Sequence, residues 1–165
     1  MIRRLLLQVA RDNAGAAIIE LALAAPILAT MVVGVSDISI AYGKKLELEQ
    51  AAQRAMEKVM QTTGEDTPED TIKKEAVCQY NGSVPDTTTG ICPGTISAAN
   101  VTVAYSLKCN GTATDYSLDC DSGQTELRYI TATVTDTYTP MFNMHFGTQS
   151  DGTYHLSTQA GVRVG

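Results

Sequence analysis

The feature that most constrains this chain is an apolar run near its N-terminus. Residues 16–36 contain a single charge, Glu20, and a basic stretch with Arg3, Arg4 and Arg11 precedes them. A helix needs about 20 apolar residues to cross the roughly 30 Å hydrocarbon core of a bilayer. The run is long enough, so we expect it to anchor the protein in a membrane as a single helix.

The charges indicate how the chain crosses that membrane. Basic residues favour the cytoplasmic side, which leaves the N-terminus in the cytoplasm and everything after Asp37 outside. From Lys44 onward the chain has nine basic and fifteen acidic residues, and the whole chain has a net charge of −6. Because an acidic surface repels phosphate, composition argues against nucleic-acid binding. The 165 residues leave room for one small head domain of about 100 residues.

Cysteine usage agrees with an extracytoplasmic head. All four cysteines lie beyond the apolar run, among turn-forming residues: Cys78, Cys92, Cys109 and Cys120. An even number in an oxidising compartment predicts two disulfides, with three connectivities open. Pairing Cys78 with Cys92 and Cys109 with Cys120 would close two short loops. A zinc site is the alternative, but there is no CxxC pair and neither histidine lies at ligand spacing.

Periodicity predicts one long helix from residue 16 to about residue 62. Its membrane part covers residues 16–36, where Pro26 should kink or locally open the helix. Residues 37–63 are amphipathic, and Gly64 is placed to cap the helix end. The apolar stripe of this part consists of Leu48, Ala51, Ala52, Ala55, Met56, Val59 and Met60. We expect it to lie on a sheet or on a neighbouring subunit.

The rest of the chain, residues 64–165, predicts a small α+β head. Thr67, Pro68 and Asp70 form an N-cap pattern, with Thr67 as the cap, which predicts a short helix from Pro68 to about Ala76. Residues 81–94 are rich in Gly and Pro and read as a loop. Alternating segments rich in Val, Ile, Thr and Tyr predict an antiparallel sheet of at least three strands, at residues 100–108, 126–138 and 154–164.

The start of the apolar run has a distinctive pattern. Gly15 ends the basic stretch, Ala16 begins the run, Glu20 is its fifth residue, and Pro26 follows. Further along come Ser36, Asp37, Tyr42 and the segment Gln50-Ala51-Ala52-Gln53-Arg54-Ala55. Gly15 to Leu21 resembles a prepilin-type processing site. More narrowly, about residues 12–60 resemble the TadE/TadG-like pseudopilins of tight-adherence pili.

The resemblance implies a function and partners. A prepilin peptidase would cleave after Gly15, so that residues 1–15 are a leader and Ala16 is the first mature residue. The fold would be type IV pilin-like, and the protein would be a pseudopilin, or minor pilin, in the inner membrane. Its partners would be the major pilin, other pseudopilins and an inner-membrane assembly platform, besides membrane lipid. The family is not enzymatic, and no cofactor is implied.

Electrostatics supplies a reason for the pattern. An acidic side chain costs about 2.5–3.5 kcal/mol at the centre of a membrane helix and less near the interface. Cleavage before Ala16 would create an ammonium group about one helical turn from Glu20, or within reach of Glu20 in a staggered neighbour. Close helix approach is favoured by small residues at four- or five-residue spacing, namely Ala25, Ala29, Thr30 and Gly34.

Other interpretations remain open from sequence alone. Ala22-Leu23-Ala24 could be the cleavage box of a secretory signal, although Glu20 interrupts the apolar region that such a signal needs. The helix could also be an uncleaved anchor for an extracytoplasmic binding or adhesion module. A small envelope enzyme using His145 or His155 is a third possibility. Neither histidine stands beside a nucleophile signature, so we assign no catalytic residue.

An acidic cluster raises the question of calcium. It consists of Asp115, Asp119, Asp121 and Glu126, around Gly123. Its spacing does not fit an EF-hand loop. Turn-capping aspartates are the simpler interpretation, and we assign no metal site, while leaving open whether calcium binds near Asp119 and Asp121.

Overall fold

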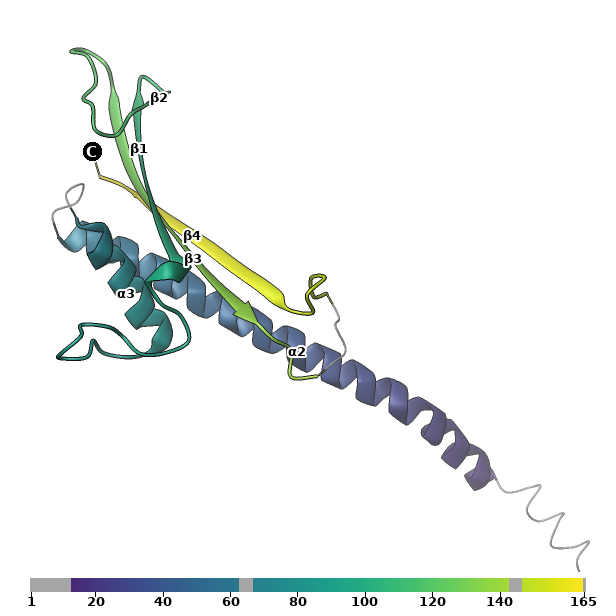
Figure 1. Ribbon diagram of the computed structural model, residues 1–165. Coiled ribbons are helices and arrows are strands. Elements are labelled where there is room, and N and C mark those ends of the chain that lie inside the picture. The colour runs from purple at the N-terminus through teal and green to yellow at the C-terminus, as the bar shows by residue number, and fades with distance from the viewer. Residues whose placement is uncertain (1–12, 63–66, 143–146, 165) are drawn as a thin grey trace, which may run out of the picture.

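The computed structural model describes residues 13–62, 67–142 and 147–164. Its elements are α2 (Asn13–Gln61), α3 (Glu69–Asn81), the 3-10 turn η2 (Ala98–Asn100), β1 (Val101–Cys109), β2 (Thr112–Thr114), β3 (Glu126–Tyr138) and β4 (Tyr154–Arg163). Figure 1 shows α2 as a long rod whose N-terminal half projects beyond the head, while α3 and the sheet pack on its other half. The expected α+β fold, with a long helix on a small antiparallel sheet, is confirmed.

The helix α2 is one element of 49 residues, which makes it about 70 Å long at about 1.5 Å per residue. Its helical assignment continues through Pro26 without a break. The proline ring removes one N–H donor, a loss that a helix of this length tolerates. The helix ends at Gln61, and Gly64, the expected cap, lies outside the described residues.

The C-terminal half of α2 buries the expected apolar stripe. Six of its members are at most 4% exposed: Leu48, Ala51, Ala52, Ala55, Met56 and Val59. Met60, which the pattern placed with them, is instead 62% exposed. It follows Val59 directly and is therefore turned by about 100° around the helix axis, away from the core. Because the alanine side chains are small, neighbouring elements can approach α2 closely, and α3, β3 and β4 all contact it.

The helix α3 differs from the prediction at both ends. It begins at Glu69 rather than Pro68, and the Thr67 hydroxyl does not cap it but shares a 2.8 Å hydrogen bond with Thr62. It also continues past Ala76 to Asn81, because buried residues recur at helical spacing up to Tyr80. A left-handed Gly82, with φ of 58°, closes it.

The four strands form one antiparallel sheet in the order β2-β1-β3-β4. The three predicted strands are confirmed to within one residue at each end. The short strand β2 was not predicted. It pairs with the end of β1 through a turn at Asn110 and Gly111, whose φ angles of 49° and 87° are both positive. An Asn-Gly pair is a strong hairpin signal, so this turn and the strand after it are features that the sequence does encode locally.

The core lies between the helices and one face of the sheet. On β3 it consists of Ile130, Ala132 and Val134, which are fully buried at alternate positions. β4 turns every second side chain to the same side, including Leu156 and Val162, which pack against the core. Because α2 runs along β3 and β4 while α3 contacts β1, the two helices cover one face of the sheet together.

Two disulfides brace the loops, as the sequence predicted. They join Cys78 to Cys92 and Cys109 to Cys120, the pairing that closes two short loops. Asn81 reinforces the first loop: its amide nitrogen donates to the carbonyls of Cys92 and Ile96 at 3.1 and 2.9 Å, and its oxygen accepts from the N–H of Ile96. The segment after α3 is therefore held against the helix despite its Gly- and Pro-rich sequence.

Candidate functional site

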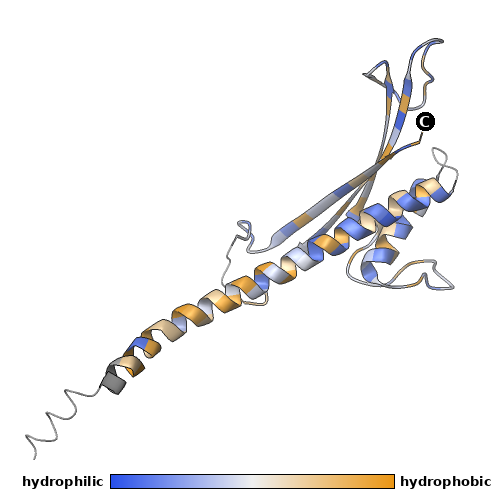
Figure 2. Ribbon diagram, turned by 180° about the vertical axis from the view of Figure 1, so that it is seen from behind, coloured by the Kyte–Doolittle hydropathy of each residue, from blue (hydrophilic) through white to orange (hydrophobic). Residues whose placement is uncertain are grey.

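The projecting half of α2 exposes the apolar side chains that the sequence places in a membrane. The segment of highest hydropathy in this helix has none of its residues buried inside the protein. Ile18, Leu21, Ile27 and Val32 are each at least 60% exposed. Figure 2 shows this half as mostly hydrophobic, in contrast to the mixed surface further along the helix. This helix fits a single-pass membrane anchor by length and composition.

Glu20 is the acidic residue within this apolar surface. Its side chain is exposed and has no hydrogen bond or ion pair to any other residue in the described ranges. Gly15 and Ala16 lie in the first turns of α2, about one helical turn before Glu20. The basic residues Arg3 and Arg11 lie outside the described residues. The described part of the head therefore offers Glu20 no counter-charge.

Hydroxyl groups on this half of α2 are satisfied within the helix. Thr30 Oγ1 donates to the Pro26 carbonyl at 2.7 Å, and Ser36 Oγ donates to the Val32 carbonyl at 2.8 Å. Such bonds to the preceding turn remove the cost of a polar group in lipid, where no water is available. These residues can face hydrocarbon despite their polarity. Glu20, by contrast, has no hydrogen bond or ion pair within the part of the chain that the structure describes.

Asp37 marks the point where α2 meets the head. Its side chain is only 4% exposed, and it accepts hydrogen bonds from the backbone N–H groups of Met141 and Phe142, at 3.0 and 3.3 Å. The Tyr138 hydroxyl also donates to Asp37, at 3.4 Å. One buried carboxylate therefore ties the segment after β3 to the helix. Its own desolvation is offset by these donors.

The tyrosines at this end of the sheet extend the same contact. The rings of Tyr138 and Tyr154 stack with centroids 6.1 Å apart, where β3 and β4 pair. Burial, followed by the charge of Asp37 and its hydrogen bond, raises the pKa of Tyr138 above its usual value. The phenol stays protonated and remains a donor to the carboxylate at neutral pH.

A second polar contact joins α3 to the sheet. The Tyr80 hydroxyl donates to Asp136 on β3 at 2.5 Å, and burial followed by this bond raises the pKa of Tyr80. Lys44 of α2 lies over the Tyr80 ring, with its Nζ 5.5 Å from the centroid. Helices and sheet are thus connected by directional contacts as well as by apolar packing.

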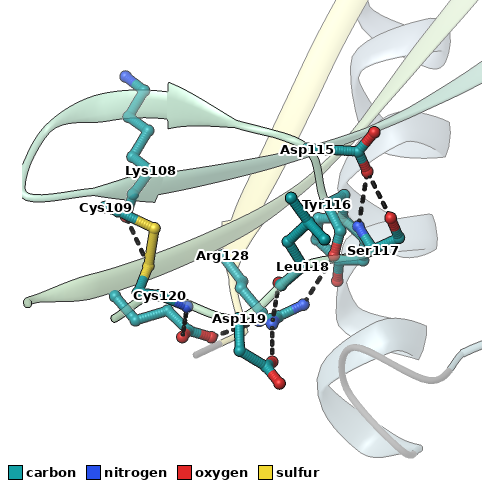
Figure 3. A network of polar contacts seen from close by, with 10 residues as sticks. Lys108, Cys109, Asp115, Tyr116, Ser117, Leu118, Asp119, Cys120 and Arg128 are labelled. Carbon is teal, nitrogen blue, oxygen red and sulfur yellow. Dashed lines mark hydrogen bonds and ion pairs between the residues drawn. A yellow bond between two sulfur atoms is a disulfide. The ribbon is translucent and has the colours of Figure 1, made fainter. Parts of the chain in front are cut away.

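The far end of the head is organised by Arg128, as Figure 3 shows. Its guanidinium donates to the carbonyls of Tyr116 and Leu118, both at 2.9 Å, and forms ion pairs with Asp119 and Glu126. This pairing, together with an N–H donated by the Cys120 backbone, lowers the pKa of Glu126. The arginine thus anchors the loop that the Cys109 to Cys120 disulfide closes.

The acidic cluster considered for calcium is occupied by these contacts. Asp119 and Glu126 bind Arg128, while Asp115 accepts hydrogen bonds from the backbone and hydroxyl of Ser117. The Asp121 carboxylate accepts a long hydrogen bond of 3.5 Å from the side-chain amide of Gln124, and its backbone carbonyl accepts the Gln124 N–H at 3.0 Å. Within the described ranges, no three His, Cys, Asp or Glu side chains gather as a metal site.

The two histidines give no catalytic arrangement that we can describe. His145 lies outside the described residues. His155 Nε2, at the start of β4, lies 2.6 Å from Asp151 Oδ2 in the turn before that strand, and both side chains are about half exposed. This hydrogen bond, with those from the Thr153 N–H and hydroxyl, lowers the pKa of Asp151 to about 2. The pair braces a surface turn.

Comparison with known families adds one finding. Residues 15–56 match the model of the TadE-like protein family. The resemblance to TadE-like proteins is thereby confirmed for most of the helix α2. The TadE-like segment includes Gly15, Glu20, Pro26 and Asp37, and it ends at Met56 within the buried stripe. No curated protein and no solved structure matched the chain.

Two structural roles are not evident in the sequence pattern. The pattern shows Asp37 only as an acidic residue directly after an apolar run, and it does not distinguish Arg128 from other basic residues. The donors to Asp37 lie more than 100 residues further along the chain. Arg128 acts by binding backbone carbonyls and carboxylates of a loop that only the fold brings to it.

Proposed function

We propose that this protein is a pseudopilin, or minor pilin, that acts in the assembly of a tight-adherence pilus. The observation that carries the proposal is the TadE-like match over residues 15–56, on a helix whose apolar half stands free of the head. Such a helix has a surface to offer to lipid and to other subunits. The role is structural and requires no catalytic residue.

The proposed processing step exposes a new N-terminus. A prepilin peptidase cleaves after Gly15, removes the basic leader of residues 1–15, and leaves Ala16 as the first residue. Residues 16–36 then span the inner membrane with the N-terminus on the cytoplasmic side. Residues 37–63 and the head, residues 64–165, lie outside the cytoplasm, where the disulfides Cys78–Cys92 and Cys109–Cys120 are stable.

Glu20 then pairs with the Ala16 ammonium of its own chain or of a neighbour. Two unit charges about 4 Å apart gain about 4 kcal/mol at an effective dielectric constant of about 20. That gain matches the cost of about 2.5–3.5 kcal/mol for an acidic residue in a membrane helix. Glu20 has no partner in the described part of its own head, which supports a partner supplied by assembly.

Lateral packing of the helices is supported by small residues on the same segment. A Cβ added at Gly34 would meet nothing within 4 Å apart from the adjoining residues of its own helix, so that position leaves room for a neighbouring helix. Ala25 and Ala29 are exposed. In lipid, close approach through small residues drives association because apolar burial gives no net gain. The proposed partners are the major pilin, other pseudopilins and the inner-membrane platform.

The first test is the N-terminus of the mature protein. Intact mass and N-terminal sequencing of the membrane-extracted chain should show Ala16 as the first residue. A chain that begins at Met1 would contradict the proposal and would favour a permanently anchored binding or adhesion module.

The second test separates insertion from assembly. Glu20→Ala should leave the protein resistant to carbonate extraction while abolishing its crosslinking to other pilus components. The matched control is Glu57→Ala, on the same helix, where an exposed glutamate pairs with Arg54 at 3.1 Å. Normal crosslinking of the Glu20 variant would refute the charge pairing.

A further inference from the structure

Two exposed apolar side chains lie beside the point where α2 leaves its apolar segment. Met141 and Phe142 are 72% and 43% exposed and lie three and four residues after the end of β3 at Tyr138. Their backbone N–H groups are bonded to Asp37, so their position along α2 is fixed. In Figure 1 the chain after β3 lies against the middle of α2, at the membrane-proximal end of the sheet.

The depth of this contact follows from the length of the apolar segment. Residues 16–36 rise about 30 Å as a helix, which equals the thickness of the hydrocarbon core. Asp37 therefore comes just where the helix enters the outer interfacial zone. On the helix itself, Val35 and Ile38 remain 63% and 50% exposed on either side of Asp37. Met141 and Phe142 thus extend a surface that is already apolar.

The backbone of this segment is prepared for a poorly hydrated environment. Pro140 has no N–H, and the next two N–H groups both donate to Asp37. Three consecutive residues therefore present no unpaired backbone donor. Unpaired donors are what prevents loops from entering lipid.

Tyrosines lie near Asp37, close to the expected membrane surface. Tyr138 and Tyr154 stack at the end of the sheet, and Tyr42 of α2 is 63% exposed just beyond Asp37. Tyrosine is enriched at membrane interfaces because its ring is apolar while its hydroxyl remains hydrated. The residues closest to the membrane are thus of the kind that the interface favours.

We infer that Met141 and Phe142 insert into the outer interfacial zone of the bilayer that α2 crosses. The lipid, at the boundary between headgroups and acyl chains, is their partner. The head is then held to the membrane at two points, the helix and this loop, which restricts its tilt. The inference rests on the membrane anchor of the proposed function.

The protein contains no tryptophan, so a single introduced indole reports its own depth. The full chain is reconstituted in phosphatidylcholine vesicles whose acyl chains are brominated at different depths. Phe142→Trp should be quenched most by bromine close to the headgroups and should resist iodide in the aqueous phase. Met141→Trp places the probe on the more exposed neighbour and should behave in the same way.

Two matched variants calibrate the measurement. Ile27→Trp lies in the middle of residues 16–36 and should be quenched by deeply brominated lipid. Val84→Trp replaces a side chain that is 82% exposed. Val84 lines the same surface pocket as Arg54, and Arg54 lies roughly 25 Å beyond Ser36 along α2. Because this position is far from the apolar segment, the tryptophan of this variant should be quenched by iodide and not by brominated lipid.

The outcomes separate this inference from the anchor. If I27W is quenched by lipid while F142W and M141W behave like V84W, the loop does not touch the bilayer and the inference is overturned. If I27W itself is not quenched, the membrane anchor is wrong and the inference falls with it. Lipid quenching of both loop variants, with V84W unaffected, supports the inference.

Discussion

The carboxylate of Asp37 provides the most direct test of how the head is held on α2. Replacing it with alanine removes the acceptor for two backbone N–H groups, those of Met141 and Phe142. A hydrogen bond to a charged group is worth about 1.5–3 kcal/mol, and each 1.4 kcal/mol corresponds to about a tenfold change in an equilibrium. Asp37→Ala should therefore accelerate amide exchange at both positions by about 10- to 100-fold.

The effect should be local, because the segment can open without unfolding the core. Exchange measured by mass spectrometry or NMR on the full chain in micelles reports such openings residue by residue. Amides in the middle of β3, such as that of Ile130, should keep their protection. Global loss of protection would show that Asp37 supports the whole head and not only the segment after β3.

An asparagine at the same position sharpens the test. Asp37→Asn keeps one carbonyl oxygen, which should continue to accept from Met141, the closer donor at 3.0 Å. Its amide nitrogen cannot accept from Phe142, so exchange should accelerate at Phe142 more than at Met141. Glu57→Ala serves as the control and should change neither rate. Unchanged exchange at both amides in the alanine variant would refute the assigned role of Asp37.

Two further predictions address packing and pH. Ala52 is fully buried on α2, so a larger side chain there would overpack the core. Ala52→Leu should lower the free energy of unfolding by about 1–3 kcal/mol in denaturant titrations. The control Gln53→Leu, at the exposed neighbouring position, should change this free energy little. The pKa of Asp151 is lowered from its ordinary value of 3.8 to about 2 by its bonds to His155 and Thr153. These bonds should therefore stabilise the turn fully at pH values above 3.8, and that stabilisation should be lost as the pH falls through about 2. Carboxyl chemical shifts followed by NMR should show this titration, and a midpoint near 3.8 would contradict it.

Much of the architecture is determined by patterns that are local in the sequence. The apolar run predicts a membrane anchor because its length matches a bilayer, and α2 fits that prediction by length and composition. The alternating segments identify β1, β3 and β4 to within one residue, because a strand with one buried face must alternate. The even number of cysteines beyond the run predicts two disulfides, which the structure contains.

Other features depend on contacts between distant parts of the chain, and sequence patterns do not show them. α3 extends to Asn81 because Tyr80 reaches Asp136 and because the Asn81 side chain binds the loop at Ile96. Met60 fits the apolar pattern but points away from the core, since the positions of α3 and the sheet decide which side of α2 is covered.

The clearest division lies along α2 itself. Glu20 can be recognised from sequence, because its spacing from Gly15 and its place in an apolar run are local facts. Asp37 is also an acidic residue beside that run, yet its role appears only when β3 brings Met141 and Phe142 to it, more than 100 residues later. A charge in lipid is costly wherever the head lies, whereas a buried carboxylate is stabilised only by the donors that folding delivers to it.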